Sequence, residues 1–344
     1  MKIKNIIVGS FLLCITVFSV KAQDIQFSQY YNVTPYINPA FVGSTPVLRA
    51  IINARWQWLG QDARYNSYYI STDYNWHKYN SGIGFYFVSD NQAQNTISAN
   101  ELALQYVYFV NISKKLTLRL GLQSSYNYRS VDVQRLTFPN QFTGHGFDQT
   151  ITNPDQINAT KGHYLDFAGG AFLYSQRFWI GYAPYHLNRP NRSLIGENER
   201  LNVRHECIVG YKFPIKLHGN KPKAVGVYDD AMAITPTIHY KFQGKSDQLD
   251  LGLFLSYYQL LFGLWYRGLP IVKDYEKDKT NNESFVFSLG VKLDQMTISY
   301  SYDWVISKQN RYNYGAHEIN LNFYWPKRSK VKQNDKYKPI PCPK

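Results

Sequence analysis

The sequence predicts an all-β protein, a single transmembrane antiparallel β-barrel of about 14 strands in the outer membrane. The prediction rests on strict alternation of apolar and polar residues, repeated at short intervals, and on an aromatic content of 17%. Side chains on a strand point to alternate faces, so each such stretch has one apolar face for lipid and one polar face for the lumen. In the last stretch the apolar face carries Ile319, Leu321, Phe323 and Trp325.

The first 22 residues predict a secretory signal peptide. A basic start, Met1–Lys4, precedes the apolar run from Ile6 to Val20, and small residues permit cleavage near Ala22-Gln23. After residue 22 no stretch approaches the roughly 20 consecutive apolar residues of a spanning helix. The mature chain therefore crosses the membrane with strands if it crosses at all.

Residues 23–45 form a separate N-terminal segment. The segment is polar and aromatic, it contains Pro35, Pro39 and Gly43, and it has no clear period. We expect an ordered element, either a plug that enters the lumen or a belt on the periplasmic rim.

Residues 46–325 form the predicted barrel, with its strands at regular spacing. In the first strand, Trp56 and Trp58 are placed at the membrane–water boundary, where amphipathic rings are favoured. The predicted strands are 47–58, 67–77, 82–90, 98–110, 115–128, 163–174, 176–186, 203–213, 230–241, 248–257, 261–268, 284–293, 296–305 and 315–325.

The connections alternate in length, as expected for an outer-membrane barrel. Tight connections follow strands 2, 4, 6, 10 and 12, whereas longer ones such as 129–162 tend to follow odd strands. Because periplasmic turns are short and outer loops are long, this parity predicts periplasmic termini. The exception is the long connection 214–229, which must also lie on the periplasmic side.

Charged residues of both signs lie on the predicted inward faces, and two interpretations stay open: a charged conduit, or mutually paired charges that fill the lumen. The residues are Arg49, Arg55, Asp73, Glu101, Arg119, Asp166, Arg204, Glu206, Asp250, Lys292, Asp303 and Glu318.

No catalytic, cofactor-binding or metal-binding motif is present. The eight histidines are scattered without metal-ligand spacing. Asp274, Glu276 and Asp278 resemble the start of a calcium loop, but Phe285 stands where its last glutamate is required. We therefore expect no enzyme, cofactor or metal, although an outer-membrane hydrolase and a porin or solute transporter remain competing functions.

The last segment, 326–344, is a basic tail that we expect on the periplasmic side. Removal of three lysines with the signal peptide lowers the formal charge from +14 to +11, and the tail carries +6 of it. The tail is either disordered or a docking peptide for a periplasmic protein; a secreted barrel would rarely meet nucleic acid. The predicted partner-binding residues are Lys327, Arg328, Lys330, Lys332, Lys336, Lys338 and Cys342.

Several motifs together resemble one family. FSQYYNVTPYINPAFVG at 27–43, RWQW at 55–58, GIG at 82–84, SYDW at 301–304 and GAHEI at 315–319 resemble the PorP/SprF family of outer-membrane proteins from type IX secretion systems. The signature residues are Phe27, Pro39, Gly43, Arg55, Trp58, Asp303, Gly315, His317 and Glu318.

The resemblance implies a non-enzymatic barrel that supports export or surface attachment of secreted proteins, with links to gliding motility. It implies one of two protein partners: periplasmic lipoproteins of the secretion machine, or one large secreted adhesin with a C-terminal targeting domain. Outer-membrane lipid would surround the barrel.

Overall fold

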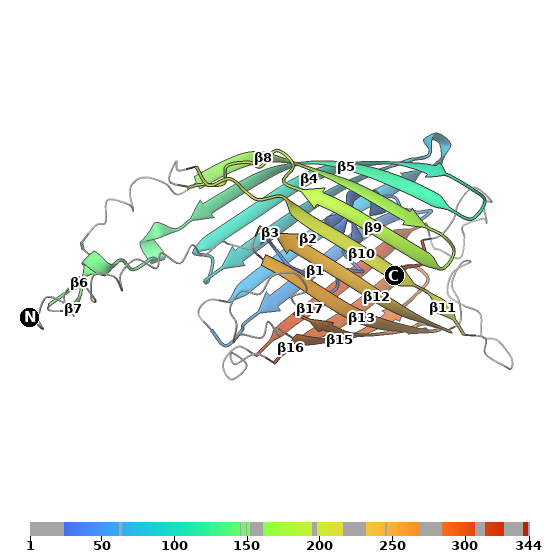
Figure 1. The fold of residues 1–344 in the computed structure, drawn as a ribbon. Coiled ribbons are helices and arrows are strands. Elements are labelled where there is room, and N and C mark those ends of the chain that lie inside the picture. Colours follow the sequence, from blue (N-terminus) through green and yellow to red (C-terminus); the bar gives the residue numbers. More distant parts are fainter. Residues whose placement is uncertain are drawn as a thin grey trace, which may run out of the picture.

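The computed structural model describes residues 24–61, 64–144, 146–148, 150–151, 161–194, 198–215, 232–244, 246–268, 284–306, 314–326 and 340–342. The fold is a closed antiparallel barrel of fourteen strands, which confirms the predicted class (Figure 1). The barrel strands are β1 (Leu48–Gln57), β2 (Tyr65–Trp76), β3 (Ser81–Gln92), β4 (Ile97–Asn111), β5 (Thr117–Val131), β8 (Lys161–Tyr174), β9 (Phe178–Tyr185), β10 (Arg204–Tyr211), β12 (Met232–Gln243), β13 (Ser246–Tyr257), β14 (Leu260–Arg267), β15 (Ser284–Lys292), β16 (Met296–Val305) and β17 (Ala316–Trp325).

The barrel closes where its first strand pairs with its last. Leu48 lies opposite Trp325, and Gln57 lies opposite Ala316. The remaining neighbours follow one another along the chain, and β10 pairs directly with β12. Closure gives each of these strands a partner on both sides, although β8 pairs with β9 only over Ala171–Tyr174.

The predicted alternation is visible along β17. Ile319, Phe323 and Trp325 are exposed on the outside, whereas Glu318 and Asn320 are buried inside. Exposed apolar side chains continue around the outer face, for example Leu104 and Leu122. A wall that is apolar outside and polar inside suits a bilayer. Among the described residues, no helix is long and apolar enough to cross a membrane.

The two ends of the barrel differ. One end, here the short-turn end, has the connections 77–80, 112–116, 175–177, 258–259 and 293–295, together with the longer 212–231. The opposite, long-loop end has the connections 58–64, 132–160, 186–203, 268–283 and 306–315, with short ones at 93–96 and 244–245. β1 begins and β17 ends at the short-turn end.

The connection between β5 and β8 contains small elements of its own. They are the 3₁₀ turns η4 (Val133–Arg135) and η5 (Pro139–Gln141) and the hairpin of β6 (Phe142–Thr143) and β7 (Gly146–Phe147). The hairpin projects beyond the barrel at the left of Figure 1. The other short elements are η3 (His77–Tyr79) and β11 (Phe213–Pro214).

Candidate functional site

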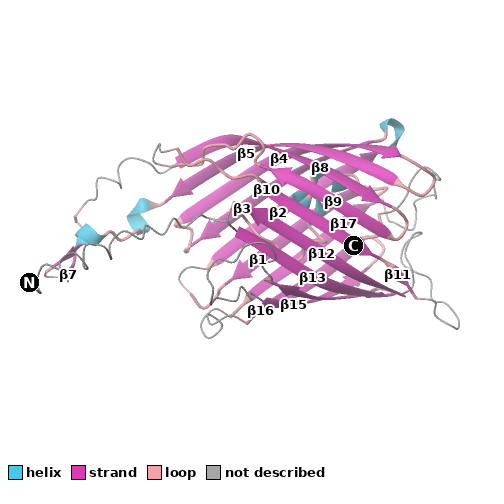
Figure 2. Cartoon of the chain, viewed as in Figure 1, coloured by secondary structure: helices cyan, strands magenta, loops and turns pink. Residues whose placement is uncertain are grey.

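The lumen is filled by residues 24–45, here the plug segment. Every residue from Phe27 to Thr45 is buried, and the segment contains the helical turns α2 (Thr34–Ile37) and η2 (Pro39–Phe41). Figure 2 shows these turns inside the strand wall. Proline lies in the first turn of both, and the Asn38 side chain accepts a hydrogen bond from Ala40 N at 2.8 Å. Proline and an N-cap asparagine favour helix starts, so the sequence itself directs this local structure.

Four residues of the wall form a cluster, here the lumen ion cluster: Arg55, Arg267, Asp303 and Glu318. Arg55 contacts Asp303 at 3.0 Å and Glu318 at 3.2 Å, and Arg267 contacts Asp303 at 3.1 Å. All four side chains are nearly inaccessible. Their charges are therefore neutralised mainly by one another, as buried ion pairs require.

The lumen ion cluster binds the start of the plug segment. The backbone amides of Ser28 and Gln29 donate to the Glu318 carboxylate at 2.7 and 3.1 Å. The Ser28 hydroxyl donates to Asp303 at 2.6 Å, and Arg55 donates to the same hydroxyl. Charge-assisted hydrogen bonds of this kind are stronger than neutral ones. Strands β1, β16 and β17 therefore jointly fix the start of the plug segment to the wall.

A second attachment holds the end of the plug segment. Gly43 N donates to the Asp73 carboxylate at 2.7 Å, and Asp73 also pairs with Arg49 at 2.7 Å. Gly43 has a φ of +61°, and a Cβ there would lie 2.9 Å from Tyr74 O. Only glycine accommodates both this left-handed backbone and this close approach.

A third attachment holds the middle. Arg119 donates to the backbone oxygens of Ala40, at 2.7 Å, and of Val42. A Cβ on Gly121 would lie 2.5 Å from Ala40 N and 2.6 Å from the Pro39 carbonyl carbon. The plug backbone therefore lies directly against β5, in space that the missing side chain leaves.

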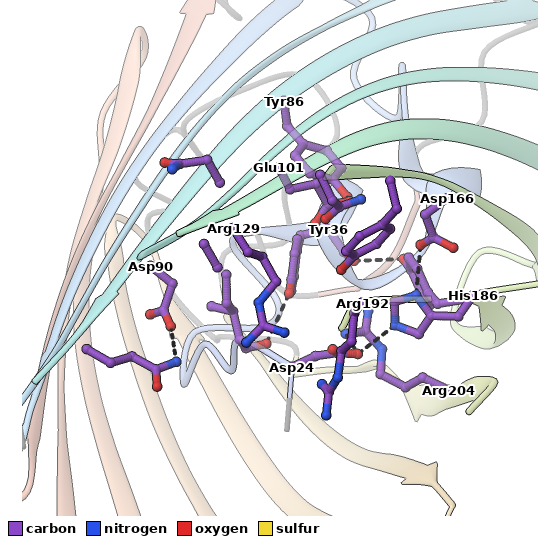
Figure 3. Close-up of a pocket in the computed structure, with 17 residues that line it drawn as sticks. Asp24, Tyr36, Tyr86, Asp90, Glu101, Arg129, Asp166, His186, Arg192 and Arg204 are labelled. Atoms are coloured by element: carbon purple, nitrogen blue, oxygen red, sulfur yellow. Dashed lines mark hydrogen bonds and ion pairs between the residues drawn. The ribbon is translucent and has the colours of Figure 1, made fainter. Parts of the chain in front are cut away.

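The plug segment runs from one end of the lumen to the other. Its first described residue, Asp24, accepts hydrogen bonds from His186 at 2.8 Å and Arg204 at 2.9 Å, at the long-loop end (Figure 3). Its last residues lead into β1 at the short-turn end. His186 also contacts Asp166 at 2.8 Å, so its imidazole lies between two carboxylates.

The position of His186, directly after β9, changes its protonation. Burial disfavours the charged imidazole, but Asp24 and Asp166 outweigh that effect and raise the pKa of His186 from 6.5 to about 9. At neutral pH, His186 is therefore charged and helps to fix Asp24.

We expect the barrel to lose stability as the pH rises through about 9. A group whose pKa rises on folding contributes stability that is complete below its ordinary value, here 6.5, and is lost above its folded value, here about 9. For His186 this amounts to at most about 3 kcal/mol. Urea unfolding in detergent across this range measures the effect. The variant His186→Gln should lose the pH dependence, and an unchanged dependence would assign it to other groups.

The structure places the sequence-predicted residues in different regions. Arg55, Asp303 and Glu318 meet in the lumen ion cluster, and Phe27 packs edge-on against Tyr36 beside it, with ring centroids 5.2 Å apart. Pro39 and Gly43 shape the plug segment.

The other three signature residues lie away from the plug segment. Trp58 N donates to Gly315 O at 2.9 Å, across the β1–β17 closure at the long-loop end. His317 lies on the outer surface of the wall, where its Nδ1 contacts the Tyr300 hydroxyl at 2.7 Å.

Of the predicted partner-binding residues, only Cys342 is described. Ile340 and Cys342 are each 8% exposed and belong to the same buried apolar cluster as Phe172 and Trp179. The Cys342 and Cys207 sulfurs are not joined by a disulfide. The remaining predicted residues lie outside the described residues: Lys327, Arg328, Lys330, Lys332, Lys336 and Lys338.

Ser28 and Arg267 take part in the plug attachment, although neither is among the residues predicted from the sequence. Arg267 lies on the buried face of β14 with Trp265, so the same alternation identifies it. Ser28 lies in a segment without a period, and no local signal distinguishes it from its neighbours.

The inward charges are paired rather than free along much of the wall. Besides the lumen ion cluster, Arg204 contacts Glu206 at 3.1 Å, and Arg267 contacts Asp250 at 3.4 Å. Within the described part of the chain, no group of three or more His, Cys, Asp or Glu side chains could hold a metal ion. The arrangement can fix a peptide segment inside a barrel.

Comparison with known proteins gives similar solved structures and one family. The Ralstonia pickettii toluene transporter TbuX is similar at 9% identity and a TM-score of 0.44, over 85% of this chain and 91% of that one. A Pseudomonas aeruginosa FadL homologue is similar at 10% identity and a TM-score of 0.43, over 86% and 94%. A search of the curated proteins returns no match.

The family model of the type IX secretion system membrane protein PorP/SprF matches residues 19–323. This match covers the end of the predicted signal peptide, the plug segment and nearly all of the barrel. The chain is an outer-membrane β-barrel that belongs to the PorP/SprF family of type IX secretion system membrane proteins.

Proposed function

We propose that this barrel is a non-enzymatic, non-conducting component of the type IX secretion system. It supports export or surface attachment of secreted proteins through contacts at its periplasmic end. The observation that carries the proposal is the filled lumen: residues Phe27–Thr45 are buried there and hydrogen-bonded to strands around the wall. A secreted polypeptide then passes through another component, and this barrel serves as a membrane anchor.

The short-turn end is the natural periplasmic side, because periplasmic turns of bacterial barrels are short. β17 ends there, so the basic tail starts where periplasmic lipoproteins of the secretion machine are accessible. Six cationic side chains within 327–338 favour a partner with an acidic surface.

Neutralising the tail tests this assignment. The variant changes Lys327, Arg328, Lys330, Lys332, Lys336 and Lys338 to Gln. It retains Ile340 and Cys342, which are buried against the barrel, so it is milder than deletion of 327–344. We expect co-purification with the periplasmic lipoproteins to fall severalfold in a mild-detergent pull-down, while barrel assembly stays normal, because steering charges act mainly on association.

A matched control uses the same end of the barrel. Lys78, Lys114 and Lys115 are exposed in the short turns, and their change to Gln should leave co-purification intact. Equal recovery by the tail variant and the wild type would refute tail docking.

The same pull-down addresses the alternative partner. Recovery of one very large secreted protein would make the barrel the dedicated partner of that adhesin, through its C-terminal targeting domain, and would connect it with gliding. Recovery of the barrel alone would favour a solute channel, which conductance measurements test separately.

A further inference from the structure

A pocket of about 80 Å³ lies beside the first described residue of the plug segment, at the long-loop end (Figure 3). Its wall contains the carboxylates of Asp24, Asp90, Glu101 and Asp166. Its cations are Arg129, His186, Arg192 and Arg204.

Three of these four cations are already engaged. His186 lies between Asp24 and Asp166, at 2.8 Å from each. Arg204 contacts Asp24 at 2.9 Å and Glu206 at 3.1 Å. Arg192 pairs with Glu199 at 2.9 Å, and the fourth cation, Arg129, acts electrostatically on Asp90.

Two carboxylates are only partly compensated: Asp166 shares the His186 cation with Asp24, and Glu101 is compensated by the electrostatic effect of Arg204. Asp166 is 2% exposed, and its Oδ1 is a buried acceptor without a hydrogen-bond partner. Glu101 accepts hydrogen bonds from neutral donors, the Tyr86 hydroxyl at 2.7 Å and the Gln123 amide at 3.4 Å. Glu101 and Asp166 also lie close enough to repel each other. Buried carboxylates in this state favour a cation that can donate hydrogen bonds.

The predicted cleavage after Ala22 leaves only Gln23 before Asp24, and Asp24 is fixed at the pocket by His186 and Arg204. Because consecutive Cα atoms lie about 3.8 Å apart, an α-amino group one residue before Asp24 is within reach of the pocket that Asp24 lines. We propose that this α-ammonium group binds in the pocket and pairs with Asp166 and Glu101.

An α-amino group is mostly charged at neutral pH and carries three donors. In the proposed position the ammonium group donates a hydrogen bond to Asp166 Oδ1, and its positive charge reduces the repulsion between Asp166 and Glu101. Signal-peptide removal then completes the lumen, because the group that cleavage creates becomes part of the plug attachment. The proposal depends on the cleavage site and is independent of the partner at the periplasmic end.

The test is labelling of the full processed protein, purified from outer membranes, with a reagent selective for α-amines near neutral pH. Gln23 should react about tenfold or more slowly in folded than in denatured protein, since reagent reaches it only after local opening. A variant with Gly-Ser inserted after Ala22 moves the amine out of the pocket and should react nearly as fast folded as denatured.

Two carboxylate variants complete the test. Asp166→Asn should speed labelling of the folded protein severalfold, whereas Asp148→Asn, in the outer loop, should not change it. Equal rates for the native and Gly-Ser chains would overturn the proposal. So would mass spectrometry that finds a start other than Gln23, or a Gln23 cyclised with loss of ammonia, which has no α-ammonium group. None of these outcomes changes the tail-docking test.

Discussion

Replacing Arg55 by methionine is expected to lower the free energy of unfolding of the barrel by about 3–5 kcal/mol, the usual cost of removing one partner of a buried ion pair. Arg55 is 4% exposed and contacts Asp303 and Glu318. Without it, Arg267 alone must balance both carboxylates and Asp250. Urea unfolding in detergent, followed by tryptophan fluorescence, measures the loss.

Two comparison variants make this result specific. Arg55→Met combined with Glu318→Gln removes one excess negative charge and should recover part of the loss. Arg135→Met breaks the exposed pair with Asp132 at 3.1 Å, and it should cost about 1 kcal/mol or less. If Arg55→Met costs no more than Arg135→Met, the lumen ion cluster does not stabilise the fold as described.

Replacing Gly121 by leucine is expected to displace the plug segment and open the lumen. A Cβ alone would lie 2.5 Å from Ala40 N, and Arg119 holds the Ala40 carbonyl in place. Overpacking of this kind costs about 1–3 kcal/mol or more, and the plug must shift because the strand cannot. Planar-bilayer recordings should show steady conductance for the variant and none for the wild type.

The control for this experiment is Gly144→Leu, in the connection between β5 and β8, where a Cβ meets nothing within 4 Å. It should leave both assembly and conductance unchanged. Gly121→Ala introduces the same contact with less bulk, so it serves if the leucine variant does not assemble. Conductance of the wild type equal to that of Gly121→Leu would show that the plug segment does not close the lumen, and would revive the solute-channel alternative.

The strands could be predicted from the sequence because lipid and lumen impose opposite demands on adjacent residues. The alternation through Ile319, Phe323 and Trp325 shows these opposite demands within one strand, so it can be recognised without knowing any other strand. The same rule predicts which positions face inward, and it therefore identifies Arg55, Asp303 and Glu318 as charged residues of the lumen.

The site itself could not be assembled from local pattern. Residues Phe27–Thr45 are buried on all sides, so they show no period, and a plug and a rim belt look alike in sequence. Arg55 meets Ser28 across 27 residues and Asp303 across 248 residues. Only the closure of the barrel brings these groups together, and the spacing of residues along the sequence does not predict which strands close it.

The pairing of β1 with β17 has a consequence for the order of assembly. The hydrogen bond between Ser28 N and Glu318 joins residues 290 positions apart, and Arg55 and Glu318 come from the two strands that close the barrel. The entropy of so long a loop must be lost before these contacts form. The complete attachment of the plug segment therefore requires the last strand. A chain interrupted before β17 lacks Glu318, so the start of its plug segment has no carboxylate to bind. The exposed plug segment then distinguishes such an intermediate from the finished barrel.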